Sequence, residues 1–141
     1  RIGILGAGAA TEWAIIPALS GPGATQPPDI GAWWGRRPLS SSDIRYQAPA
    51  RPDIVALCDP DGERAERVAS SARIRAVYSD WRLMLREVPL DALICATDSL
   101  LTAEVITGAN AAVKWLWIDC PPAPSSLATQ QLQKLLAGRA N

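Results

Sequence analysis

A glycine turn near the start of the chain is the first candidate for ligand binding. The stretch "ILGAGAA" at positions 4–10 runs from an apolar, strand-like segment through two glycines into a helical pattern. In such a setting the first glycine permits a tight turn, and the second lets the backbone approach a pyrophosphate at the helix N-terminus. Thr11 makes the third small position of this fingerprint imperfect, and a ligand-free strand–helix turn is the alternative interpretation. The stretch predicts phosphate contacts at four small residues, which are Gly6, Gly8, Ala9 and Ala10.

An acid at the end of a second apolar run is the next candidate. Asp59 follows the strand-like run 54–58, and a carboxylate there can accept hydrogen bonds from both hydroxyls of an adenosine ribose and repel a 2′-phosphate. The segment 21–50 separates the two motifs; without it, their spacing is close to the usual value of about 20 residues. The pair predicts a site for NAD in preference to NADP. A cap for the following helix is a second, compatible role for Asp59.

A third candidate is the turn inside "WLWIDCPPAPSS", at positions 115–126. An apolar run that stops at a polar turn is typical of a buried strand that feeds a loop. The turn consists of Asp119, Cys120 and Pro121, and it predicts catalytic candidates at Asp119 and Cys120. A thiol whose ordinary pKa is about 8.5 can act as a weak acid or nucleophile where its pocket shifts that pKa. A small residue that merely fills space is the alternative for Cys120.

Short apolar runs alternating with helical patterns must position these residues. Strands are expected over 2–5, 54–58, 75–78, 92–96 and 115–118, and helices over 10–19, 62–71, 80–87, 101–111 and 125–137. Strands that are apolar on both faces and separated by helices require a parallel sheet with helices on each side. The sequence therefore predicts an α/β fold, a Rossmann-like doubly wound parallel sheet of about five strands in the order 3-2-1-4-5, as a single domain over 1–141.

Composition excludes several classes of function. Fourteen basic residues balance fourteen acidic ones, so no general field attracts nucleic acid or anionic membranes. The chain has no histidine and has three cysteines without a close-spaced pair, which supports neither a metal site nor a disulfide framework. Apolar runs stay well short of the length of about 18 residues that a membrane span requires. We expect a reduced, cytoplasmic setting with no metal.

The segment 21–50 interrupts the alternation after the first helix. It is rich in proline and glycine, and it contains the pairs Trp33-Trp34 and Arg36-Arg37. A loop of this length in a compact domain is usually functional or disordered. Large indole rings beside bidentate donors are the composition that interfaces favour. The segment predicts a protein partner or self-association, with tryptophans folded over the first helix as the alternative.

These stretches, taken in order, make the chain resemble the nucleotide-binding domain of the glucose-fructose oxidoreductase / inositol dehydrogenase (Gfo/Idh/MocA) family. The corresponding stretches are "RIGILGAG", "IIPAL", "IVALCDPDGERAERVA", "VYSDWRLML", "LDALICAT", "AEVI" and "WIDCPP". The resemblance implies an oxidoreductase that acts on sugars, cyclitols and related alcohols with NAD(P). It also implies a second domain that carries the catalytic Asp/His pair and most substrate contacts, which we expect to be absent from this chain.

The chain departs from the family pattern at the fifth strand. Family members end that strand with Glu-Lys-Pro, whose lysine contacts substrate and nicotinamide and assists proton transfer. The aligned residues here are Asp119, Cys120 and Pro121, so the acid and the turn are kept while the lysine is replaced. The resemblance implies a cofactor contact at Asp119, and a thiol cannot replace a cationic hydrogen-bond donor.

A second departure follows the fourth strand. The family has a proline after the threonine and a histidine five residues beyond it, whereas this chain has Thr97, Asp98 and Thr102. The resemblance implies that the loop at Thr97 lies beside the nicotinamide half of the dinucleotide. We interpret Asp98 as a helix cap in preference to a new catalytic acid.

Three functions therefore remain open from the sequence. The first is the nucleotide-binding domain of a divergent NAD-dependent oxidoreductase. The second is a non-catalytic Rossmann-like binding or scaffolding module in a larger assembly, because fold alone does not establish function. The third is a site for another adenosine-containing ligand such as S-adenosylmethionine, which the glycine turn and Asp59 also tolerate.

Overall fold

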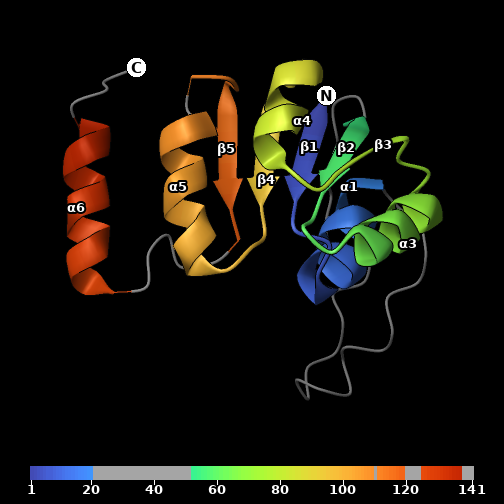
Figure 1. Ribbon diagram of the computed structural model, residues 1–141, viewed down its shortest axis with the longest axis horizontal. Helices are drawn as coiled ribbons and strands as arrows, with labels where there is room; N and C mark the ends of the chain where they lie inside the picture. The colour runs from blue at the N-terminus through green and yellow to red at the C-terminus, as the bar shows by residue number, and fades with distance from the viewer. Residues whose placement is uncertain (21–51, 110, 120–124, 138–141) are drawn as a thin grey trace, which may run out of the picture.

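A five-stranded parallel sheet forms the centre of the molecule (Figure 1). The computed structural model describes residues 1–20, 52–109, 111–119 and 125–137. The strand order is β3-β2-β1-β4-β5, as the sequence predicts. The strands are β1 (Ile2–Leu5), β2 (Ile54–Cys58), β3 (Ala76–Tyr78), β4 (Ala92–Cys95) and β5 (Trp115–Ile118). Leu5 lies in register with Cys58 on one side and Cys95 on the other. The carboxyl ends of the central strands therefore share one edge of the sheet.

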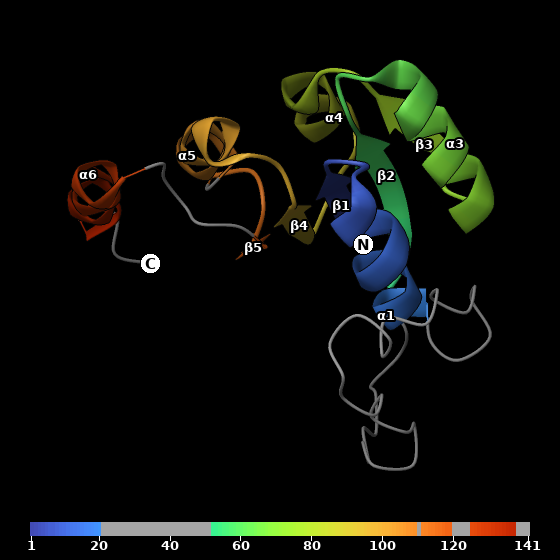
Figure 2. The same ribbon diagram turned by 90° about the horizontal axis from the view of Figure 1, so that it is seen from below.

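Helices cover the two faces of this sheet unequally (Figure 2). The helical elements are η1 (Thr11–Ile15), α1 (Ile16–Ser20), α3 (Gly62–Ala72), α4 (Trp81–Glu87), α5 (Ser99–Ala109) and α6 (Ser126–Ala137). The α1 and α3 helices lie on one face, over β1, β2 and β3, and α4 and α5 lie on the other. In both views α6 follows next in line beyond α5. This two-sided arrangement confirms the predicted doubly wound fold.

Two apolar clusters, one on each face, hold the sheet between its helices. The cluster under α4 and α5 includes Leu5, Met84, Leu93 and Val105. The cluster under α1 and α3 includes Ile4, Ile16, Leu57 and Val68. Neighbouring residues of a strand point to opposite faces, so Ile4 and Leu5 of β1 enter different clusters. The central strands are thus apolar on both faces, as the sequence predicts.

The edge strand β5 differs from this expectation. Leu116 and Ile118 pack against the cluster under α5, but Trp115 is 73% exposed and Trp117 is 67% exposed. The prediction of a strand buried on both faces is therefore wrong for β5. The physical reason is that α1 and α3 cover only the part of this face formed by β1, β2 and β3. No helix among the described residues covers the indole face of β5.

Aspartates begin three of the helices and explain where these start. The Asp61 carboxylate accepts from the backbone N–H of Arg64 at 3.1 Å, and Asp80 starts α4 in the same way. Asp98 accepts from the Leu101 N–H at 3.1 Å, which confirms its interpretation as a helix cap. A side-chain acceptor at this position satisfies an N–H group that the helix itself leaves unpaired.

The insert lies outside the described residues, which resume at position 52. The prediction for Trp33, Trp34, Arg36 and Arg37 therefore stays a prediction. Within the described ranges, every helix is too short or too polar to cross a membrane.

Candidate functional site

Gly6 makes the sharp turn at the end of β1. Its φ angle is +98°, a conformation that only glycine adopts at low cost. Its N–H donates to the Cys58 carbonyl at 2.8 Å, and the Ala96 N–H donates to the Leu5 carbonyl at 2.8 Å. A Cβ at Gly6 would stand 2.3 Å from the Ala96 carbonyl oxygen. Conformation and contact therefore both require glycine here.

Gly8 differs from Gly6 in both respects. Its φ angle is not positive, and a Cβ built on it would have no described atom within 4 Å. Neither the backbone conformation nor packing against the described residues requires glycine at this position. The space over the Gly8 backbone is open, as the approach of a ligand to the chain would require.

Thr11 occupies the third position of the glycine fingerprint. It is fully buried, and its hydroxyl donates to the Gly6 carbonyl at 2.6 Å. The π-helix η1 begins at this residue. Such wider turns are rare in proteins overall, but where they occur they are often near functional sites. The sequence predicts an ordinary helix over 10–19 and carries no signal for the π-helix. The threonine fixes the turn from within through its hydrogen bond.

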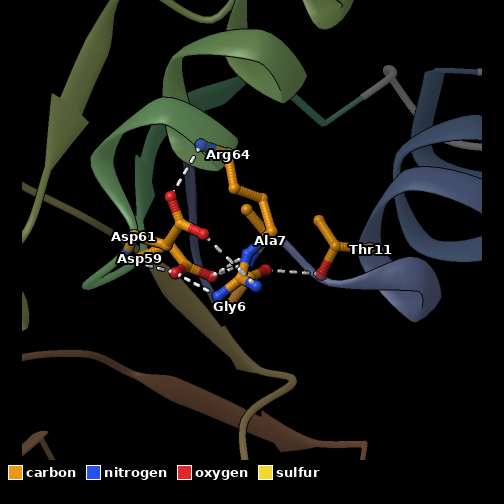
Figure 3. A network of polar contacts seen from close by, with 6 residues as sticks. All are labelled: Gly6, Ala7, Thr11, Asp59, Asp61 and Arg64. Atoms are coloured by element: carbon orange, nitrogen blue, oxygen red, sulfur yellow. Dashed lines mark hydrogen bonds and ion pairs between the residues drawn. The ribbon is translucent and has the colours of Figure 1, made fainter.

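Asp59 joins the glycine turn to the start of α3 (Figure 3). It is buried with 3% exposure. Its Oδ2 accepts from the Ala7 N–H at 2.7 Å and from the Arg64 Nε at 3.3 Å. Its Oδ1 accepts from the Asp61 N–H at 2.9 Å and from the Arg64 Nη2 at 2.7 Å. The structure thus brings together the two motifs that the sequence places 52 positions apart.

This network also fixes the charge of Asp59. Burial by itself raises the pKa of the carboxyl, but the hydrogen bond from Arg64 and those from the Ala7 and Asp61 N–H groups outweigh it. The pKa of Asp59 consequently lies below the usual 3.8, and the group is an anion at neutral pH. The cap of α3 is Asp61, so the alternative role of Asp59 as that cap is wrong.

Arg64 is the member of this network that sequence reasoning missed. It lies in the first turn of α3, and its side chain is 41% exposed, against 4% for that of Asp59. The available signal was its position in "DPDGER", five residues after Asp59. The chain turns back on itself between a strand end and the next helix, so residues at that spacing can meet.

Thr97 lies beside the glycine turn at the end of β4. A Cβ at Gly6 would approach its Cγ2 at 3.3 Å, so the two loops are in contact. Its Oγ1 is 3.4 Å from the Cys95 Sγ. Thr102 is fully buried, and its hydroxyl donates to the Asp98 carbonyl at 2.8 Å. Thr102 therefore belongs to the helix start and the core.

Asp119 lies at the carboxyl end of β5 and is exposed. Its N–H donates to the Cys95 carbonyl at 2.9 Å, which places it on the same edge of the sheet as Asp59, with β1 and β4 between their strands. Cys120 lies outside the described residues.

Burial, with smaller contributions from Asp59 and Asp80, raises the pKa of the Cys58 thiol to about 12, so this thiol stays protonated at neutral pH.

The described part of the chain contains no group of three or more histidine, cysteine or acidic side chains that could hold a metal ion. The polar groups at this edge of the sheet include the Asp59 carboxylate, the Arg64 guanidinium and the Thr97 hydroxyl. A glycine turn before a helix suits a phosphate, and a carboxylate suits the hydroxyls of a ribose.

Solved structures show the same fold. The chain is 20% identical to the WlbA dehydrogenase from Bordetella pertussis, solved with NADH and UDP-GlcNAcA, with a TM-score of 0.68 and coverage of 98% of this chain and 33% of that one. Myo-inositol dehydrogenase from Lactobacillus casei, solved with NAD(H) and myo-inositol, is 19% identical, with a TM-score of 0.67 and coverage of 94% of this chain and 32% of that one. A 3-ketoreductase from Actinomadura kijaniata, solved with NADP, is 18% identical, with a TM-score of 0.66 and coverage of 99% of this chain and 35% of that one. The chain thus spans about a third of the length of these structures.

A search of curated proteins finds no match. The family model described as "Oxidoreductase family, NAD-binding Rossmann fold" matches residues 1–141, which is the whole chain and agrees with the glycine turn, the Asp59 network and the strand order. The chain belongs to the GFO_IDH_MocA family of oxidoreductases, as its NAD-binding Rossmann domain.

Proposed function

We propose that this chain binds the dinucleotide of a sugar, cyclitol or related alcohol oxidoreductase across the carboxyl ends of β2, β1 and β4. The observation that carries the proposal is the open space over Gly8, next to a buried, ionised Asp59. The open space over Gly8 leaves the backbone accessible to a ligand. The neighbouring carboxylate supplies the acceptor that an adenosine ribose needs.

Each half of the dinucleotide has its own residues in this proposal. The pyrophosphate lies against the backbone of the glycine turn, at Gly6, Gly8, Ala9 and Ala10. The adenosine ribose lies at Asp59, and the nicotinamide half lies toward Thr97 and Asp119. When bound, the nicotinamide accepts or donates a hydride. The residues of this chain bind the cofactor and hold that ring at the sheet edge.

The substrate class rests on the family and on the neighbouring structures. Two of the neighbours are solved with UDP-GlcNAcA and with myo-inositol, which favours a polyhydroxylated substrate. Because the chain spans about a third of those structures, we place the substrate-binding residues outside 1–141. Asp119 and Cys120 remain the candidates of this chain for a part in the reaction, as the sequence predicts.

A non-catalytic binding module is the second candidate function. The resemblance implies that Cys120 and Thr102 stand where the family has a lysine and a histidine, and this replacement favours the module. Thr102 is fully buried, with its hydroxyl directed to the Asp98 carbonyl, so it offers no proton at the sheet edge. No other described residue at this edge is a histidine or lysine, the side chains best matched to proton transfer near neutral pH.

A graded series at Gly8 tests cofactor binding. The unmodified chain, Gly8→Ala and Gly8→Val are titrated with NADH by calorimetry, and their melting temperatures are compared. We expect binding by the unmodified chain, weakening of about tenfold or more in Gly8→Ala, and loss in Gly8→Val. The melting temperature of Gly8→Ala should stay within about 3 °C of the unmodified chain, because its Cβ meets open space. Unchanged NADH affinity in Gly8→Val would remove the glycine turn from the site.

Turnover tests whether the 141-residue chain is catalytic by itself. We expect no steady-state NADH production from myo-inositol or other cyclitols and sugars by the 141-residue chain alone. Cys120→Ser should leave NADH binding unchanged, since it exchanges one small side chain for another of similar size. NADH production by the unmodified chain that disappears in Cys120→Ser would make the thiol a catalytic residue and contradict this expectation.

A further inference from the structure

The face of the sheet under α1 and α3 continues past these helices onto β4 and β5. Residues in register across the strands share this face: Ile4 of β1 is in register with Ile94 of β4, which is in register with Trp117 of β5. Ile4 and Ile94 belong to the apolar cluster under α1 and α3. The exposed fraction rises along this row from 0% at Ile4 to 9% at Ile94 and 67% at Trp117. The row is therefore one apolar surface that helices cover at one end only.

Two indole rings form the uncovered end of this surface. Trp115 and Trp117 are two residues apart on β5, so both rings project from the same face of the sheet, and both are largely exposed. Ala92, which is in register with Trp115, and Ile94 lie beside them on β4. These four apolar residues form what we call the indole surface. Exposed apolar surfaces that are contiguous in this way mark interaction sites.

The indole surface lies at the foot of a step in the molecule. α1 stands over β1, and no described helix covers this face of β5 (Figure 2). A helix with its side chains is about 10–12 Å across, and two packed sheets lie about 10 Å apart. A second sheet therefore fits onto β4 and β5 beside α1, at the same height as that helix.

The step is complementary to itself. A twofold axis that packs the β4–β5 faces of two copies together sets each α1 beside the β5 edge of the other copy, so both copies make the same contacts. The four residues of the indole surface carry no charge, so the packing of one such surface on another buries no unpaired ion. Shape and charge thus both suit a second copy of this chain.

We infer that the indole surface is the contact between two copies of this chain, which form a symmetric pair by packing the β4–β5 faces of their sheets together. This inference goes beyond the proposed function and is independent of it. The contact lies on a face of the sheet, whereas the proposed cofactor site follows the carboxyl edge.

The area of the contact predicts a weak pair. A buried aromatic side chain covers about 150–250 Å², so four partly buried rings contribute on the order of 600 Å² in a pair. Stable interfaces bury about 1,200–2,000 Å² in total. We therefore expect a dissociation constant on the order of 0.1 mM. At the low micromolar concentrations of optical unfolding experiments, the chain is then a monomer with exposed rings.

Sedimentation equilibrium of the 141-residue chain without cofactor tests the pair. Between about 5 µM and about 1 mM, we expect the mean mass to rise from that of one chain toward that of two. Trp115→Thr with Trp117→Thr should keep the mass of one chain over the whole range. Leu127→Gln is the matched control, because it removes an apolar side chain that is 64% exposed on α6, which lies in line with α5 over the other face. Its dissociation constant should stay within about twofold of the unmodified value.

Trp117→Lys is a second variant for the case in which the double variant does not fold. It changes one exposed position and sets like charges from the two copies against each other, so the dissociation constant should rise about tenfold or more. Circular dichroism checks that each variant is folded.

The inference is overturned by an unmodified chain that keeps the mass of one chain at the highest concentration. It is also overturned by a pair that persists in the folded double variant or in Trp117→Lys, because another surface would then carry the contact. A mass that rises beyond two chains would contradict the twofold arrangement, which closes at the dimer. None of these results depends on NADH, so the Gly8 series tests the proposed function separately.

Discussion

The two halves of the sheet are built to different degrees. Around β1 and β2, helices cover both faces and the carboxyl ends hold a closed network of Gly6, Ala7, Asp59 and Arg64. Around β5, one face carries two exposed indole rings, and the end of the strand carries the exposed Asp119. The half that would hold the adenosine side of a dinucleotide is complete within the described residues. In the half around β4 and β5, Asp119 is held by its backbone hydrogen bond to Cys95 in the sheet.

The difference follows from what each half must do. A dinucleotide site depends on backbone N–H groups and one buried acid, which a single Rossmann domain can supply. A hydride-transfer site also depends on substrate contacts and a proton donor, and the described residues at the carboxyl ends of β4 and β5 include no histidine or lysine. The contrast agrees with a chain that spans about a third of its structural neighbours.

Gly6→Ala should produce the largest effect by breaking the complete half. A side chain at φ +98° costs about 1–2 kcal/mol, and the contact of 2.3 Å with the Ala96 carbonyl adds about 1–3 kcal/mol more. We therefore expect a loss of about 3 kcal/mol in the free energy of unfolding, measured with urea. The matched variant Gly8→Ala, with open space around its Cβ, should lose less than about 1 kcal/mol. Equal losses in the two variants would contradict the distinct roles assigned to the glycines.

Asp59→Asn should have a smaller effect that depends on pH. The amide would present N–H groups to a place where the carboxylate accepts from the Ala7 or Asp61 N–H, and it would leave Arg64 without its anion. We expect a loss of about 2 kcal/mol in the free energy of unfolding at pH 7. The exposed Glu66 on the same helix provides the control, and Glu66→Gln should change stability by less than about 0.5 kcal/mol.

The pH dependence has a definite sign. The pKa of Asp59 is lowered in the folded chain, so its contribution is fully present above the unfolded pKa of about 3.9 and is lost as pH falls through the lower folded pKa. The gap between the unmodified chain and Asp59→Asn should therefore be constant from pH 7 to about pH 5 and shrink at lower pH. A gap that stays constant down to pH 3 would show that it does not arise from ionisation of Asp59.

The sequence predicted the complete half better than the open one. Gly6 and Asp59 directly follow two neighbouring parallel strands, and the pairing of these strands brings their ends together. The contact between the glycine turn and Asp59 therefore followed from the pattern. Arg64 was missed because its partner is set by how an arginine side chain folds back from α3, which periodicity does not encode. The π-helix at Thr11 was missed for a related reason, since it depends on a single buried hydroxyl.

The tryptophans of β5 were predicted as core for a reason that holds elsewhere in the sheet. Alternation and apolar runs report that a strand is suited to burial on both faces, and they do not report which neighbours are present to cover it. Ile4 and Leu5 of β1 are covered on both faces. Trp115 and Trp117 carry the same kind of signal and are exposed. Residue type alone therefore could not place the boundary of the covered sheet.

Replacing both indole rings should have the smallest effect on the isolated chain. Trp115→Thr with Trp117→Thr keeps residues that favour strands and removes side chains that are 73% and 67% exposed, so we expect a change of less than about 1 kcal/mol in the free energy of unfolding. Ile118→Ala, on the face packed under α5, should cost more, about 1–2 kcal/mol, because it removes apolar contacts. Circular dichroism during urea unfolding measures both without relying on indole fluorescence. A loss above about 2 kcal/mol in the double variant would mean that this face is covered in solution, and the contrast between the two halves of the sheet would then fail.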